Sequence, residues 1–184
     1  MSIMKKTIVS LVFLLSFTIL ASAQRTMAGH AQMSGSGTFL FDSMGAGLSG
    51  GVYTLGGYWE GGAEVIFHQT GLSSGEVLPY VHSSAHGGFN QRIFSTTDRM
   101  VNLYVGGGAF FGLEEIDPND TIPSSVVTDL EKESVIYGLY AKAEAEVFLT
   151  GHIAFAPFVR VPYNVSAQVY SVLYEAGVSL RYNF

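Results

Sequence analysis

Hydrophobic and polar residues alternate along most of this 184-residue chain. The longest example runs from Val135 to Leu149, where every second residue is Val, Tyr, Leu or Ala. The residues between them include Lys142, Glu144 and Glu146. Successive side chains of a β-strand point to opposite faces, whereas a helix would mix the two sets around its circumference. The segment is therefore predicted to be a long amphipathic strand.

The same alternation recurs in five further segments, which are Trp59–His68, Val81–Ile93, Val101–Leu113, Ile153–Tyr163 and Val172–Phe184. The glycine-rich region before them has room for two more strands, which we expect around Gly29–Phe41 and Gly45–Leu55. The predicted connections alternate in length. Three are short (Gly56-Gly57, Ser95–Arg99 and Thr150–His152), and those near Thr70–Leu78 and Glu114–Glu133 are longer. About eight antiparallel strands with alternating short and long connections are typical of an up-and-down β-barrel.

Both soluble β-proteins and membrane barrels alternate, and two features favour the membrane form. The polar face is small and rich in glycine, which suits the crowded interior of a narrow barrel rather than a solvated outer surface. The chain also ends on an apolar alternation that finishes with Tyr182 and Phe184. This ending resembles the insertion signal that the barrel-assembly machinery reads in outer-membrane proteins. We therefore predict an all-β fold, a small antiparallel up-and-down transmembrane β-barrel embedded in outer-membrane lipid.

The first residues have the features of an export signal. Lys5 and Lys6 precede an apolar run from Thr7 to Leu20, and Ala21-Ser22-Ala23 supplies small residues at a cleavage site. The apolar run is shorter than the ~20 residues that a membrane-spanning helix needs, so a retained anchor is the weaker interpretation. We expect residues 1–23 to be a signal peptide and residues 24–184 to form one barrel domain in the outer membrane of a Gram-negative cell.

Composition narrows the functional classes. Only 13% of residues are charged, and the chain left after removal of the signal peptide has 7 basic and 15 acidic residues, for a formal charge of −8. An acidic exported chain lacks the basic face that binds phosphates, so we expect no direct contact with nucleic acid. The chain has no cysteine, which excludes disulfides, thiol nucleophiles and cysteine zinc sites.

The polar face carries the candidate chemistry. We expect acids and bases on it to pair inside the barrel, because charges removed from water must be compensated. This predicted lumen charge network comprises Glu60, Glu64, Lys142, Glu144, Glu146, Arg160, Glu175 and Arg181. A divalent metal site is the competing interpretation, since His and carboxylate side chains bind such ions, and its ligands would be Glu64, His68, His82 and His86. The spacing of these four residues is not that of a compact metal motif, so we predict neither a metal nor another cofactor.

Catalytic motifs are not indicated. Residues 45–50 match G-x-G-x-x-G, but no helix follows them, so a dinucleotide site is not predicted. The histidines are predicted to lie within strands or beside a short turn rather than in a Ser/His/Asp arrangement at an outer rim. We therefore expect a protein that is not an enzyme.

Dispersed positions along the chain resemble one known family. They are Gln24-Arg25, Tyr58-Trp59, Leu78-Pro79, Gly87-Gly88, residues 105–116, Ile136-Tyr137-Gly138, residues 144–163 and the ending at residues 176–184. Their order and spacing are similar to those of the conjugal transfer protein TraO family of conjugative transposons in Bacteroides and its relatives. The resemblance implies a non-enzymatic outer-membrane component of a type IV secretion-like DNA transfer apparatus, with other conjugative transfer proteins as partners. Two alternatives stay open. One is a stand-alone small barrel for adhesion or envelope stability, and the other is a small barrel enzyme that acts on lipid.

Overall fold

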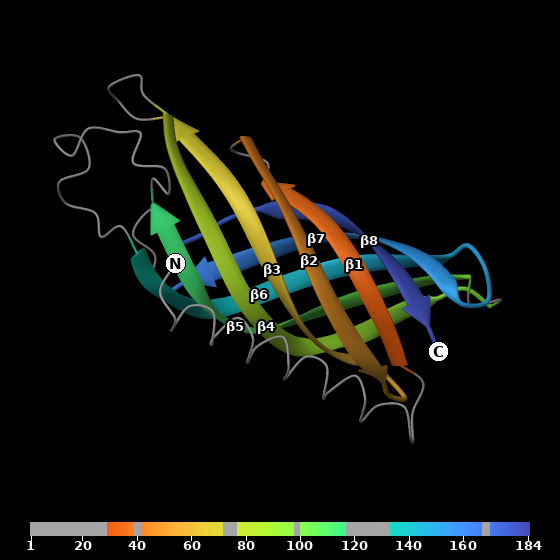
Figure 1. Ribbon diagram of the computed structural model, residues 1–184. Coiled ribbons are helices and arrows are strands. Elements are labelled where there is room, and N and C mark those ends of the chain that lie inside the picture. Colours follow the sequence, from red (N-terminus) through yellow and green to blue (C-terminus); the bar gives the residue numbers. More distant parts are fainter. Residues whose placement is uncertain (1–28, 39–41, 72–76, 98–99, 117–132, 167–169) are drawn as a thin grey trace, which may run out of the picture.

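The described residues of the computed structural model form a closed antiparallel β-barrel of eight strands (Figure 1). These residues are 29–38, 42–71, 77–97, 100–116, 133–166 and 170–184. The strands are β1 (Gly29–Thr38), β2 (Asp42–Tyr53), β3 (Gly57–Gly71), β4 (Val77–Ser95), β5 (Val101–Ile116), β6 (Glu133–Phe148), β7 (Ile153–Asn164) and β8 (Glu175–Asn183). In this part of the chain there is no helix long and apolar enough to cross a membrane. The predicted signal peptide lies outside the described residues.

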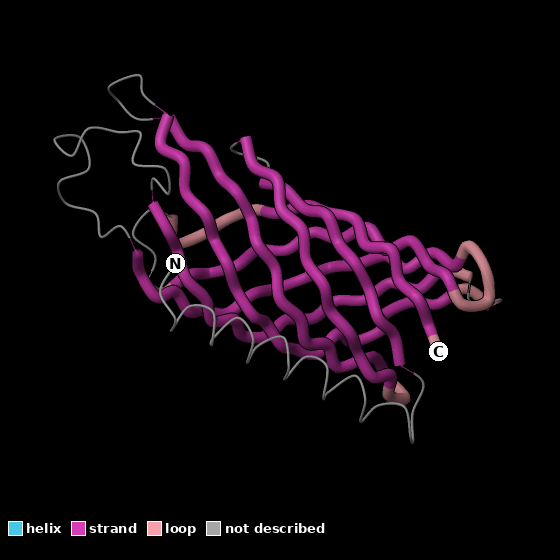
Figure 2. The backbone as a smooth tube through the Cα atoms, in the orientation of Figure 1, coloured by secondary structure: helices cyan, strands magenta, loops and turns pink. Residues whose placement is uncertain are grey.

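Each strand pairs with its neighbours in the sequence, and β8 closes the ring against β1 (Figure 2). The backbones of Gly29 and Phe184 exchange hydrogen bonds of 3.1 and 3.0 Å at this seam. The end of the seam at Gly29 and Phe184 lies beside the turns that join β2 to β3, β4 to β5 and β6 to β7. We call this side of the barrel the short-turn end, and the opposite side the far end.

The prediction of an all-β barrel with about eight strands is confirmed, but several expected boundaries were wrong. Strand β2 begins at Asp42 rather than Gly45, because Ser43 and Met44 continue its pairing with β3. Strand β5 continues to Ile116, so the first residues of the predicted loop after Leu113 are part of the sheet. Strand β8 begins at Glu175, although Val172 makes an isolated bridge to Tyr163.

Apolar side chains cover the outside of the barrel. Exposed aromatic side chains form a belt near each end, with Trp59, Phe155 and Tyr182 towards the short-turn end and Phe67, Tyr137 and Tyr163 towards the far end. Between the belts lie aliphatic residues such as Val65, Leu139 and Val159. Two aromatic girdles that flank an apolar band are characteristic of barrels that span a lipid bilayer.

Glycine makes room for the large side chains inside the barrel. Three inward-facing aromatic residues stand directly opposite a glycine on the neighbouring strand, in the pairs Phe110–Gly138, Tyr140–Gly108 and Phe158–Gly177. A Cβ atom added at Gly177 would lie 2.6 Å from Cζ of Phe158 and 2.5 Å from the carbonyl oxygen of Gly35. The glycines that distinguish the composition are therefore part of how a narrow interior is filled.

Candidate functional site

The interior of the barrel is polar, and most of its charged side chains are buried. The eight residues predicted as a lumen charge network all lie on inward-facing positions, on strands β3, β6, β7 and β8. The structure brings them together in two groups. We call these groups the Arg181 cluster and the Arg160 cluster.

Arg181 is the centre of the first group. Its guanidinium donates hydrogen bonds to Glu144 (2.6 Å) and Glu146 (2.8 Å) on β6, and to the Gln32 side-chain oxygen on β1 (2.7 and 3.0 Å). Two buried alanines of the intervening strand β7, Ala154 and Ala156, have side chains small enough for the guanidinium to reach β6.

Lys142 extends the Arg181 cluster across the barrel. Its ammonium lies 2.9 Å from Glu60 on β3 and 3.0 Å from Glu144 on its own strand. The hydroxyl of Tyr58, also on β3, donates to Glu144 at 2.8 Å. Strands β3 and β6 are not neighbours in the ring, so these contacts connect separate walls of the barrel through its interior.

The Arg160 cluster lies closer to the far end. One guanidinium nitrogen of Arg160 is 2.5 Å from a carboxylate oxygen of Glu64 and 2.5 Å from one of Glu175. The Ser84 hydroxyl donates to Glu64 at 3.3 Å. The cavity beside these groups holds about 10 Å³, which is too small for anything larger than a water molecule. Among the described residues, side chains therefore fill this layer of the barrel.

The residues of the competing metal hypothesis are not arranged as ligands. Glu64 is bound to Arg160, His68 stacks on Tyr80 with ring centroids 4.5 Å apart, and the rings of His68 and His82 are 6.4 Å apart. Within the described ranges, no group of three or more His, Asp and Glu side chains is placed to hold a metal ion. Both ring nitrogens of His68 are buried and have no hydrogen-bond partner among the described residues, so this histidine packs as an aromatic ring.

Tyr182 and Phe184 lie at the short-turn end of the seam, and both side chains are exposed on the outside of the barrel. Tyr182 pairs with Ala31 of β1 and Ile153 of β7, and the rings of Tyr182 and His152 stack with centroids 6.0 Å apart. Their role as an insertion signal stays a prediction.

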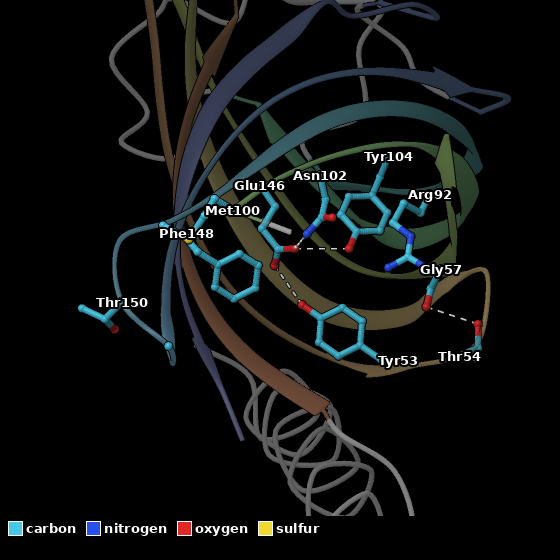
Figure 3. A pocket seen from close by; sticks show the side chains of 11 residues that line it. Tyr53, Thr54, Gly57, Arg92, Met100, Asn102, Tyr104, Glu146, Phe148 and Thr150 are labelled. Carbon is cyan, nitrogen blue, oxygen red and sulfur yellow. Dashed lines mark hydrogen bonds between the residues drawn. The ribbon is translucent and has the colours of Figure 1, made fainter. Parts of the chain in front are cut away.

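The short-turn end contains an open cavity of about 490 Å³ that the sequence did not reveal (Figure 3). Its lining includes Tyr53, Arg92, Asn102, Tyr104, Glu146 and Phe148. Glu146 receives hydrogen bonds from the Tyr53 hydroxyl (2.8 Å), the Asn102 amide (3.0 Å) and the Tyr104 hydroxyl (3.2 Å), besides its ion pair with Arg181. The alternation places Arg92, Asn102, Tyr104 and Glu146 on the polar face. It does not reveal how deep each one lies along the barrel, so the cavity could not be inferred.

Solved structures with a similar fold include β-barrel proteins of the bacterial outer membrane. The fold resembles the N-terminal β-barrel domain of Pseudomonas aeruginosa OprF, with a TM-score of 0.56 and 14% identity over 86% of this chain and 98% of that chain. A major outer membrane protein from Thermus thermophilus gives a TM-score of 0.55 and 12% identity, over 86% of this chain and 100% of that one. Neisserial surface protein A gives 0.53 and 13%, over 86% and 96%. Together with the apolar outer surface, these likenesses define the fold class as a transmembrane β-barrel of the outer-membrane type.

The family follows from the sequence. The family model for conjugative transposon protein TraO matches residues 22–184, and the chain belongs to this family. The resemblance noted from dispersed positions is thereby confirmed. Comparison with curated proteins gives no significant match.

Proposed function

We propose that this protein is a non-enzymatic outer-membrane component of a conjugative DNA transfer apparatus. In this proposal residues 1–23 are removed on export, and residues 24–184 fold as a single barrel in the outer membrane of a Gram-negative cell. The observation that carries the proposal is the family match over nearly the whole of a chain that folds as a barrel with an apolar outer band. Its surroundings would be outer-membrane lipid, the barrel-assembly machinery and other transfer proteins.

The mechanism we propose is structural. The Arg181 and Arg160 clusters fill the interior with paired charges, which suits a rigid anchor better than a conduit for DNA. A DNA strand would also meet an acidic chain that lacks a basic face. The protein would therefore position its partners through its turns and loops, while the strand itself passes elsewhere in the apparatus.

A donor strain that lacks the gene tests this proposal. Conjugative transfer should fall strongly and return when the gene is supplied in trans, while growth of the donor stays normal. The restored protein should be found in the outer-membrane fraction and should migrate differently on a gel before and after boiling. Unchanged transfer from the deletion strain would overturn the proposal.

The alternative is a stand-alone barrel for adhesion or envelope stability. It predicts that the deletion leaves transfer unchanged and instead alters surface attachment or sensitivity to detergent. The same pair of strains therefore separates the two functions.

A further inference from the structure

The cavity at the short-turn end combines an apolar wall with one cationic side chain. Tyr53, Tyr104, Phe148 and Met100 supply most of the wall, and Arg92 points into the same space (Figure 3). Its volume of about 490 Å³ lies within the range of roughly 300–1,000 Å³ that small-ligand sites occupy.

A β-bulge positions Arg92. The pairing of β4 with β5 shifts between Arg92, which lies opposite Tyr104, and Phe94, which lies opposite Leu103. The extra residue, Ile93, and Phe94 are both exposed, at 62% and 51%. The bulge thus ends the regular alternation directly after Arg92, as bulges beside functional sites do when they orient a side chain.

Arg92 differs from the other cations that face the interior. Lys142, Arg160 and Arg181 are buried, and each is paired with carboxylates. Arg92 is exposed, and in the part of the chain that the structure describes it makes no ion pair. Its guanidinium donates a 3.5 Å hydrogen bond from Nη2 to the carbonyl oxygen of Leu55. Most of its donors are therefore available to a ligand.

The floor of the cavity is closed. Glu146 is 0% exposed and already receives four hydrogen bonds, while Arg181 and Tyr58 beneath it are also 0% exposed. A ligand must enter and leave through the same mouth. The end of a chain or a single side chain fits this shape, and a polymer that runs through the barrel does not.

Guanidinium groups bind carboxylates with paired hydrogen bonds, and aromatic walls accept apolar side chains. A peptide that ends in an apolar residue carries a carboxylate and an apolar side chain on the same residue. We propose that this cavity binds the carboxyl-terminal residue of a partner protein, with its α-carboxylate on Arg92 and its apolar side chain between Tyr53, Tyr104 and Phe148. The inference rests on the proposed function for the partner's location, because the short turns of such barrels face the periplasm.

Methionine methyl groups give a direct test on the isolated barrel in lipid nanodiscs. Met100 lines the cavity, whereas Met33 and Met44 are on the outside, exposed at 65% and 74%. The probe is the peptide Gly-Ser-Gly-Ser-Phe with a free carboxylate, and its control is the same peptide with a C-terminal amide. The ¹³C-methyl NMR signal of Met100 should shift saturably with the free acid, while the signals of Met33 and Met44 stay in place.

The variant Arg92→Gln should weaken binding of the free acid by about tenfold, to the level of the amide. Arg92→Lys keeps the charge but loses the paired geometry, so its affinity should lie between the two. Each variant must show the heat-dependent gel migration of a folded barrel.

Equal binding of acid and amide, no shift of Met100, or equal shifts of all three methionines would overturn the proposal. These outcomes concern the isolated barrel and leave the proposed role in transfer standing. Loss of that role would appear in the deletion strain instead. In a donor cell, Arg92→Gln with a normal level of folded barrel should reduce transfer if the partner belongs to the apparatus.

Discussion

A single arginine links four strands inside this barrel. Arg181 extends from β8 and contacts Gln32 of β1, Tyr58 of β3 and two glutamates of β6. Each donor of the guanidinium that faces these groups has an acceptor, which offsets much of the free-energy cost of removing the charge from water. Arg181 stabilises the interior because it makes all of these contacts at once, and no single contact accounts for its effect.

Replacing Arg181 with methionine should destabilise the barrel by about 3–5 kcal/mol, because Glu146 loses its ion pair and Glu144 keeps one of its two cationic partners, Lys142. Urea unfolding of the protein in lipid vesicles measures this change. The triple variant Arg181→Met, Glu144→Gln, Glu146→Gln removes the uncompensated charges as well and should recover a substantial part of the loss. Wild-type stability of the single variant would show that the cluster does not stabilise the fold.

At the scale of the strand, the outer face has the apolar side chains expected of a surface in contact with lipid. Val159 lies midway along β7 between the two aromatic positions Phe155 and Tyr163, and it is 48% exposed. Its side chain should therefore lie near the middle of the hydrocarbon core.

Val159→Arg should destabilise the inserted barrel by about 2–4 kcal/mol, whereas Leu149→Arg in the β6–β7 turn should cost about 0–1 kcal/mol. Both side chains are apolar and exposed, at 48% and 60%, so the main difference between the two variants is depth in the bilayer. Equilibrium unfolding in vesicles compares the two variants. Equal effects would mean that β7 does not cross the membrane at this point.

Strands whose two faces differ strongly in hydropathy could be predicted from the sequence. The ends of strands whose faces differ little could not be located. On β6 the outer face has an unbroken series of apolar residues, so this strand can be predicted without knowledge of its neighbouring strands. Half of the residues in strands β1 and β2 are Gly or Ser, which give little hydropathy contrast between the two faces, so the pattern does not fix where these strands end.

The pairing inside the barrel was beyond the sequence for another reason. Alternation assigns Arg181 and Glu144 to the same face, but it does not fix the register and tilt that bring β8 and β6 to the same depth. The bulge after Arg92 was hidden in the same way, since Ile93 and Phe94 are both apolar and either could face outward.

At the scale of the whole molecule, the interior is divided into a filled part and an open mouth. The two charge clusters occupy the filled part, and the 490 Å³ cavity stops above Glu146. This arrangement differs from that of wide barrels, whose interiors are continuous aqueous channels.

Purified barrel in a planar lipid bilayer should therefore give no stable ionic conductance. The variant Arg160→Ala, Glu64→Ala, Glu175→Ala removes the cluster nearer the far end and serves as a comparison, since it widens that part without touching the mouth. Steady porin-like steps from the wild-type protein would contradict the closed interior.

The seam between β1 and β8 sets the order of events during biogenesis. Strand β1 is the first of the eight strands to be synthesised, but its second partner, β8, is the last. Until then one edge of β1 carries unpaired amide and carbonyl groups. Hydrocarbon cannot form hydrogen bonds with these groups, and pairing with another chain would lead to aggregation. Strand-by-strand insertion from the amino terminus is therefore unfavourable. The edge of β1 is satisfied only when β8 pairs with it and the backbones of Phe184 and Gly29 exchange hydrogen bonds.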